Sequence, residues 1–203
     1  MDTLKHFKKL KFSQLDLYSE YTRLLDEGVI SWGNGNQICL TSIPEKPNDM
    51  YLGINSLWYD WSKMYKELDK AGNEKIFVPP HDNPLDEDDF TYFIDAFKGT
   101  LFENAYNEVS KHYEVGRVRL MKNNPGTCMS WHYDPTSRIH YPLKTQIGCK
   151  MIIEDEVMEL PKHEWWWTDT SKYHTALNGS RETRIHLVFV ILGEKNNERS
   201  FTQ

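Results

Sequence analysis

The sequence predicts an α+β protein with one domain, in which N-terminal helices support a double-stranded β-helix, the cupin-like form of the jelly roll. Three observations predict this fold. A chain of 203 residues suits a single domain with one core. Apolar residues recur at helical spacing up to about residue 112, and beyond it they follow the two-residue period of strands. The second half then contains several short strands between turn-like segments, as sandwiches and barrels do.

Residues 1–112 are expected to form the mainly helical support region. Apolar side chains at helical spacing predict helices over Ser13–Asp26, Ile54–Ala71 and Phe90–His112, and a turn with a short strand over Trp32–Thr41. Ser13 is a plausible N-cap of the first helix, and Gly28 follows its end. The acidic run from Asp86 to Asp89 suits the start of the last helix. The aromatic stripe of the middle helix indicates a packing face.

Residues 113–193 are expected to form the jelly-roll core, and residues 194–203 a C-terminal tail. The predicted strands are short and rich in aromatic or β-branched residues: Gly116–Lys122, Ser137–Thr145, Gly148–Ile153, Glu164–Thr168 and Thr183–Leu192. Turn-like segments such as NNPG and NGSRE separate them. This alternation of short strands and turns favours a sandwich or a barrel.

Composition narrows the partners and the compartment. The net charge is −6, and acidic and basic residues are interspersed, so a main function in holding nucleic acid is not expected. The three cysteines form no CxxC, which favours a reducing, cytoplasmic setting over a disulfide framework. No stretch approaches 18 apolar residues and the N-terminus is charged, so we expect neither a membrane span nor a signal peptide. Oligomeric state is left open.

The segment SWHYDP, residues 130–135, carries the sharpest local signal. On an extended strand His132 and Asp134 point to the same side, whereas Trp131 and Tyr133 point away as packing residues. One imidazole and one carboxylate are two thirds of the facial triad of non-heme iron(II) oxygenases. His174, 42 residues further on, is the candidate third ligand, because a jelly roll brings distant strands side by side. The alternative is a surface histidine beside a turn-forming Asp-Pro.

Cations on two other strands indicate an anion-binding cavity. In TRIHLVFVIL both faces of the strand are apolar apart from Arg184 and His186, which share one face. A buried arginine needs an anionic partner, and a carboxylate matches its planar fork. A bound cosubstrate and an internal Asp or Glu are equally compatible. Arg138 and His140 share the polar face of RIHYPLKT, which could line a cavity or face solvent.

From about Val118 to Leu192 the chain resembles the aspartyl/asparaginyl β-hydroxylase family of 2-oxoglutarate- and Fe(II)-dependent oxygenases. The resemblance depends on the ordered motifs HYDPTSRIHYPL, WWWTDTSKYHTALN and RIHLVFVI. It implies that His132 and His174 bind the metal and that Arg184 holds the 2-oxoglutarate carboxylate. It further implies that Arg138 and His140 contact the cosubstrate, with Ser130 assisting nearby.

Asp134 marks a departure within that family. Some animal members lack the acidic ligand, whereas this chain would complete an ordinary triad of two histidines and one carboxylate. The resemblance implies Fe(II), O2 and 2-oxoglutarate as reactants, with no catalytic residue apart from the metal ligands. The expected reaction hydroxylates a C–H bond of an amino acid or of a peptide side chain, of Asp/Asn or Pro type, and releases succinate and CO2.

Two other functions stay open. A zinc-dependent hydrolase could use the same three ligands, although HExxH is absent and such an enzyme has no need of Arg184. A non-catalytic jelly-roll binding module would keep the fold without needing the ligand set.

Overall fold

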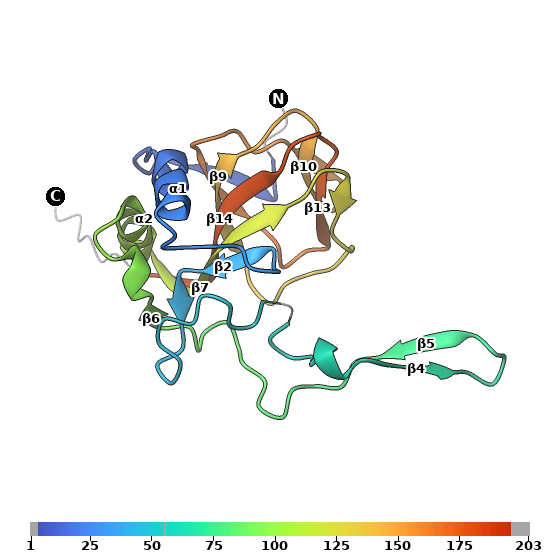
Figure 1. The fold of residues 1–203 in the computed structure, drawn as a ribbon. Coiled ribbons are helices and arrows are strands. Elements are labelled where there is room, and N and C mark those ends of the chain that lie inside the picture. Colours follow the sequence, from blue (N-terminus) through green and yellow to red (C-terminus); the bar gives the residue numbers. More distant parts are fainter. Residues whose placement is uncertain (1–3, 55, 196–203) are drawn as a thin grey trace.

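The computed structural model describes residues 4–54 and 56–195 (Figure 1). The strands are β1 (Phe7–Leu10), β2 (Gln37–Cys39), β3 (Thr41–Ser42), β4 (Tyr65–Leu68), β5 (Glu74–Phe77), β6 (Tyr92–Phe93), β7 (Tyr113–Asn123), β8 (Thr127–Cys128), β9 (Arg138–Lys144), β10 (Cys149–Ile153), β11 (Glu156–Met158), β12 (Trp165–Thr168), β13 (His174–Asn178) and β14 (Arg184–Glu194). The helices are α1 (Leu17–Asp26) and α2 (Leu101–Ser110), with 3-10 turns η1 (Trp61–Lys63) and η2 (Asp95–Phe97).

The eight strands from β7 to β14 form the predicted jelly roll. One sheet has the order β1-β12-β9-β14-β7-β2 and the other has the order β11-β10-β13-β8. Within these eight strands every pairing is antiparallel, and strands β7, β9, β12 and β14 alternate along the chain with members of the smaller sheet. This winding of one chain through two facing sheets is a double-stranded β-helix. The fold class and all five predicted strands are therefore confirmed.

The main hydrophobic core lies between the six-stranded sheet and the two helices, which sit together on its outer side (Figure 1). Strand β14 shows how the sequence produces this layer. Its odd-numbered residues Ile185, Leu187, Phe189 and Ile191 join the core with Leu24 of α1 and Phe102 of α2. Its even-numbered residues Arg184, His186 and Val188 face the opposite way, into the cavity between the two sheets, as strand alternation predicted.

Phe189 provides a test of this core. Its side chain is fully buried and packs near Trp165, so Phe189→Ala should lower the free energy of unfolding by about 3–5 kcal/mol. The matched control is Leu68→Ala on the exposed strand β4, which should stay within about 0.5 kcal/mol. Urea denaturation followed by circular dichroism measures both values. Equal losses in the two variants would contradict this placement of the core.

The first helix begins later than predicted. It spans Leu17–Asp26, and its N-cap is Asp16, whose side chain accepts from the backbone N–H of Ser19 at 3.1 Å. Ser13 was therefore the wrong cap. Its carbonyl instead accepts from the indole N–H of Trp165 on β12, a long-range bond that holds the segment before the helix against the sheet.

The helix predicted over residues 54–71 is wrong. In its place lie η1 and the first strand of the exposed hairpin β4–β5, which projects from the body of the protein (Figure 1). The turn residues decide the outcome. The carboxylate of Asp69 accepts from the backbone N–H groups of Ala71 and Asn73, and Gly72 has a positive φ of 84°. These bonds and the glycine conformation favour a reversal of the chain at residues 69–73, where the helical pattern would end.

The helix predicted over residues 90–112 is only partly confirmed. Residues 92–93 form β6, paired with β3, and the helix itself starts at Leu101 after its N-cap Thr100. Gly99 just before that cap has a φ of 72°, which ends the preceding segment. The described part of the region 1–112 holds two α-helices of ten residues each, so the prediction of a mainly helical region is wrong. Within the described residues, no helix is long and apolar enough to cross a membrane.

Candidate metal centre and its cavity

His132 lies in a loop that pairs with one residue of β13. Its backbone forms an isolated antiparallel bridge with His174, through N–H···O distances of 3.1 and 2.7 Å. The backbone N–H of Asp134 then donates to the carbonyl of Thr170 at 2.9 Å. The expectation of a regular strand at 132–134 is wrong. The predicted alternation still holds, because Trp131 and Tyr133 are exposed and point away from their inward-facing neighbours.

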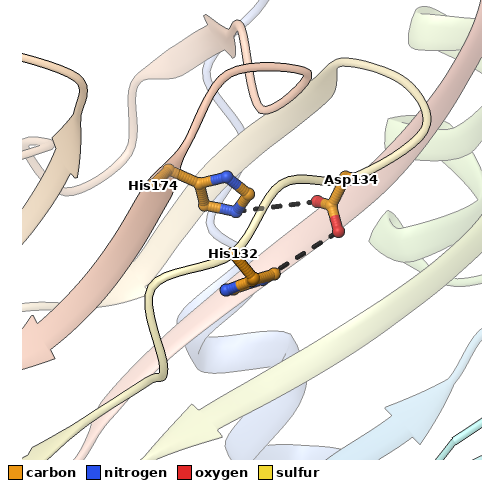
Figure 2. Close-up of side chains that lie close together, drawn as sticks. All are labelled: His132, Asp134 and His174. Atoms are coloured by element: carbon orange, nitrogen blue, oxygen red, sulfur yellow. Dashed lines mark ion pairs between the residues drawn. The ribbon is translucent and has the colours of Figure 1, made fainter.

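The three predicted ligands converge on one point (Figure 2). One ligand atom from each of His132, Asp134 and His174 lies within 4.8 Å of the other two. The Nε2 of His132 is 4.0 Å from Oδ1 of Asp134, and the Nε2 of His174 is 3.7 Å from Oδ2. Two imidazoles and a carboxylate form the donor set of a non-heme iron(II) site and also suit catalytic zinc.

Hydrogen bonds behind the two imidazoles fit metal binding. The Nδ1 of His132 is 2.7 Å from the carbonyl of Ser130, and the Nδ1 of His174 is 3.0 Å from the carbonyl of Lys172. A carbonyl only accepts, so each Nδ1 carries the proton and each Nε2 keeps a lone pair. This orientation by outer hydrogen bonds is usual for metal-binding histidines. Burial lowers the pKa of His174, which also favours the neutral imidazole.

The three ligands open into a cavity of about 330 Å³ between the two sheets. That volume is in the range of small-molecule sites. Strands β7, β9 and β14 contribute one wall, and β8, β10 and β13 contribute the other. The sequence predicted four residues that contact the cosubstrate. Three of them line the cavity, namely Arg138, His140 and Arg184. The fourth, Ser130, is exposed and not part of the lining, so its assisting role remains only a prediction.

Arg184 is a buried cation that faces the cavity. Only 7% of its surface is exposed, and within the part of the chain that the structure describes it has no carboxylate partner. Its Nε lies 2.9 Å from His186 on the same face of β14. Burial lowers its pKa to about 10, so the guanidinium remains charged at neutral pH. Of the two partners considered for Arg184, an internal carboxylate is thus not found among the described residues.

His140 and Arg138 lie on the same face of β9 but have different surroundings. Both ring nitrogens of His140 are buried without a hydrogen-bond partner among the described residues, and burial holds its pKa well below the usual value. Arg138 is paired within the protein, with Glu87 at 2.5 Å and with Asp134 at 3.4 Å. His140 is therefore free to contact a ligand, whereas Arg138 is largely occupied.

Glu87 was missed by the sequence reasoning, which assigned its acidic run to a helix start. It pairs with Arg138 and, at 3.3 Å, with Arg119 of β7. No local pattern reveals such a contact, because 51 residues separate Glu87 from Arg138. Trp131 and Tyr133 were expected to be packing residues, which is wrong, since 51% and 62% of their surfaces are exposed.

Comparison with known proteins gives one family. Residues 99–192 match the family model of aspartyl/asparaginyl beta-hydroxylase, over just under half of the chain. The match confirms the predicted resemblance over this segment. No curated protein is significantly similar in sequence to the chain.

Solved structures give only distant similarities. The protein IDO from Bacillus thuringiensis is 10% identical with a TM-score of 0.44, over 94% of this chain and 91% of its own. The viral collagen prolyl hydroxylase vCPH from Paramecium Bursaria Chlorella virus-1 is 11% identical with a TM-score of 0.42, over 92% and 95%. A 2OG-Fe(II) oxygenase family oxidoreductase from Burkholderia pseudomallei is 12% identical with a TM-score of 0.39, over 92% and 93%. Similarity at this level supports no argument about the chain.

Proposed function

Because residues 99–192 match the aspartyl/asparaginyl beta-hydroxylase family, we propose that the protein is a 2-oxoglutarate- and Fe(II)-dependent dioxygenase that hydroxylates a C–H bond. One observation carries the proposal beyond the family match. The three ligands lie at the mouth of a cavity whose wall holds Arg184, a buried cation without a carboxylate partner among the described residues. An anionic cosubstrate beside an iron site explains both features, since a buried charge is costly unless it is paired.

Each residue of the site has a distinct part in the proposal. His132, Asp134 and His174 would hold Fe(II), with the Nε2 atoms oriented by the backbone carbonyls behind them. Arg184 would bind the far carboxylate of 2-oxoglutarate, and His140, whose ring nitrogens have no hydrogen-bond partner among the described residues, would contact the same molecule. The iron and cosubstrate together supply the oxidising chemistry that hydroxylates the substrate and releases succinate and CO2.

The first test is turnover of the cosubstrate. The purified protein with Fe(II), ascorbate and 2-oxoglutarate in air should form succinate above the level of a metal-free sample. Succinate is quantified by mass spectrometry. Turnover with zinc in a hydrolase assay, and none with iron and 2-oxoglutarate, would instead favour the zinc hydrolase. Absence of turnover in every assay, with metal bound or not, would favour the binding module.

The substrate proposed is an amino acid or a peptide side chain, of Asp/Asn or Pro type. The matched family supports this class. Free amino acids and short peptides containing these residues can be screened for succinate release above the uncoupled rate, together with a mass gain of one oxygen. A strict requirement for a different chemical class, with amino acids and peptides inactive, would rule out this part of the proposal.

A further inference from the structure

Glu87 is held against the barrel by its own backbone. It lies in the segment between β5 and β6, outside the residues that match the family. Its carbonyl accepts from the backbone N–H of Arg117 on β7 at 2.8 Å. Gly116 permits this approach, because a Cβ at that position would collide with the same carbonyl. The position of the Glu87 carboxylate is thus defined by β7 and not by a flexible loop.

The carboxylate of Glu87 bridges two cations that line the cavity. Oε2 is 2.5 Å from Nη2 of Arg138, and Oε1 is 3.3 Å from Nη2 of Arg119. The three side chains are only 14%, 3% and 13% exposed, in the order Glu87, Arg138 and Arg119. Charges this far from solvent are poorly screened. Removal of the Glu87 carboxylate would therefore leave two largely buried positive charges without their shared partner.

The same network reaches the candidate metal ligand. The Nη2 of Arg138 is 3.4 Å from Oδ2 of Asp134, and that oxygen also faces Nε2 of His174 at 3.7 Å. Arg138 and a metal ion would therefore compete for one carboxylate oxygen. Glu87 gives Arg138 a closer partner, which weakens the hold of the guanidinium on Asp134.

We propose that Glu87 is a positioning residue of the metal centre, which by pairing with Arg138 and Arg119 keeps Asp134 available to a divalent cation. The inference rests on the proposed function, since it takes His132, Asp134 and His174 as the metal ligands. Glu87 itself is not among the residues that line the cavity, so it would act through the arginines. Its effect is on the affinity for the metal, through the charge and the position of the two arginines.

The experiment is a Co²⁺ titration of the full chain, followed by visible absorption and by calorimetry in the absence of 2-oxoglutarate. Loss of a partner behind a metal ligand typically costs 10- to 100-fold in affinity, and Glu87→Gln should fall in this range, about 10- to 100-fold. Glu87→Asp keeps the charge with a shorter reach and should lose less. Asp88→Asn removes an equal charge from an exposed neighbour and should bind Co²⁺ like the wild type.

A second variant protects the test against a folding defect in Glu87→Gln. Arg119→Gln removes the cation that competes with Arg138 for the Glu87 carboxylate. Glu87 then pairs with Arg138 alone, so the Co²⁺ affinity of this variant should be unchanged or higher. Wild-type affinity in a folded Glu87→Gln protein, or a loss of affinity in Arg119→Gln, would overturn the inference. If Co²⁺ binding to the wild type is absent, or is unaffected by loss of Asp134, the proposed function itself fails. That result is distinct from a failure of the inference about Glu87.

Discussion

Asp134→Ala should abolish succinate formation and reduce the affinity for Co²⁺ or Fe(II) by more than about 100-fold. Replacing a partner behind a ligand already costs 10- to 100-fold, and removal of a ligand costs more. The carboxylate also supplies the only negative charge among the three ligands, so its loss leaves a dication facing two neutral imidazoles and the nearby Arg138. His174→Ala should have the same effect on turnover.

The control for this prediction is Asp155→Ala, which removes an exposed aspartate from the turn between β10 and β11, away from the cavity. It should retain wild-type turnover and metal affinity. Metal affinity is read by calorimetry and turnover by mass spectrometry of succinate. If Asp134→Ala kept most of its turnover, two histidines would suffice in this chain, as in the animal family members without the acid, and Asp134 would lose its assignment as a ligand.

Arg184→Met should lower the affinity for 2-oxoglutarate by at least about 30-fold without destabilising the fold. Truncating one partner of a buried, charge-assisted pair costs about 2–5 kcal/mol, which corresponds to 30-fold or more. Methionine is flexible and apolar, fills part of the space of the side chain and removes a buried cation that has no carboxylate partner among the described residues. The free energy of unfolding without ligand should therefore stay within about 1 kcal/mol of wild type or rise.

Arg181→Met is the matched control, because Arg181 is exposed in the turn that precedes β14. The affinity is measured anaerobically by calorimetry with Mn²⁺ bound, and stability by urea denaturation. Neither a zinc hydrolase nor a binding module is expected to bind 2-oxoglutarate through Arg184. Unchanged affinity in Arg184→Met would remove Arg184 from the proposed 2-oxoglutarate site, whereas a wild type that binds no 2-oxoglutarate would favour those two functions.

The β-strands of the second half were predictable because their signal is local. In β14 the alternation of side chains alone separated the face that packs on the helices from the face with Arg184 and His186. The candidate metal ligands were predictable for a related reason, since an alternating His-x-Asp segment points both side chains one way when the backbone is extended. His132 and Asp134 do converge with His174, although no regular strand forms at 131–134.

The first half was harder to predict because helical spacing is a weak signal beside specific turn chemistry. The apolar residues of 54–71 fit a helix, but the turn at Asp69 and Gly72 favours a hairpin. The aromatic side chains expected to form a packing face, such as Trp58, Trp61 and Tyr65, are exposed. At 90–112 the pairing of β6 with β3 takes the residues before Gly99 out of the helix. In both places interactions between segments outweigh intrinsic helix propensity.

The sequence by itself determined the jelly-roll class, five of its eight strands and the identity of the three candidate ligands. Only the tertiary structure decided what lies around them. It leaves Arg184 without an internal carboxylate and His140 without a hydrogen-bond partner among the described residues, and it brings Glu87 against Arg138 from 51 residues away. The reason is physical: the pattern along one strand reports which face is buried, whereas the partner of a buried charge is set by segments that meet only when the chain has folded.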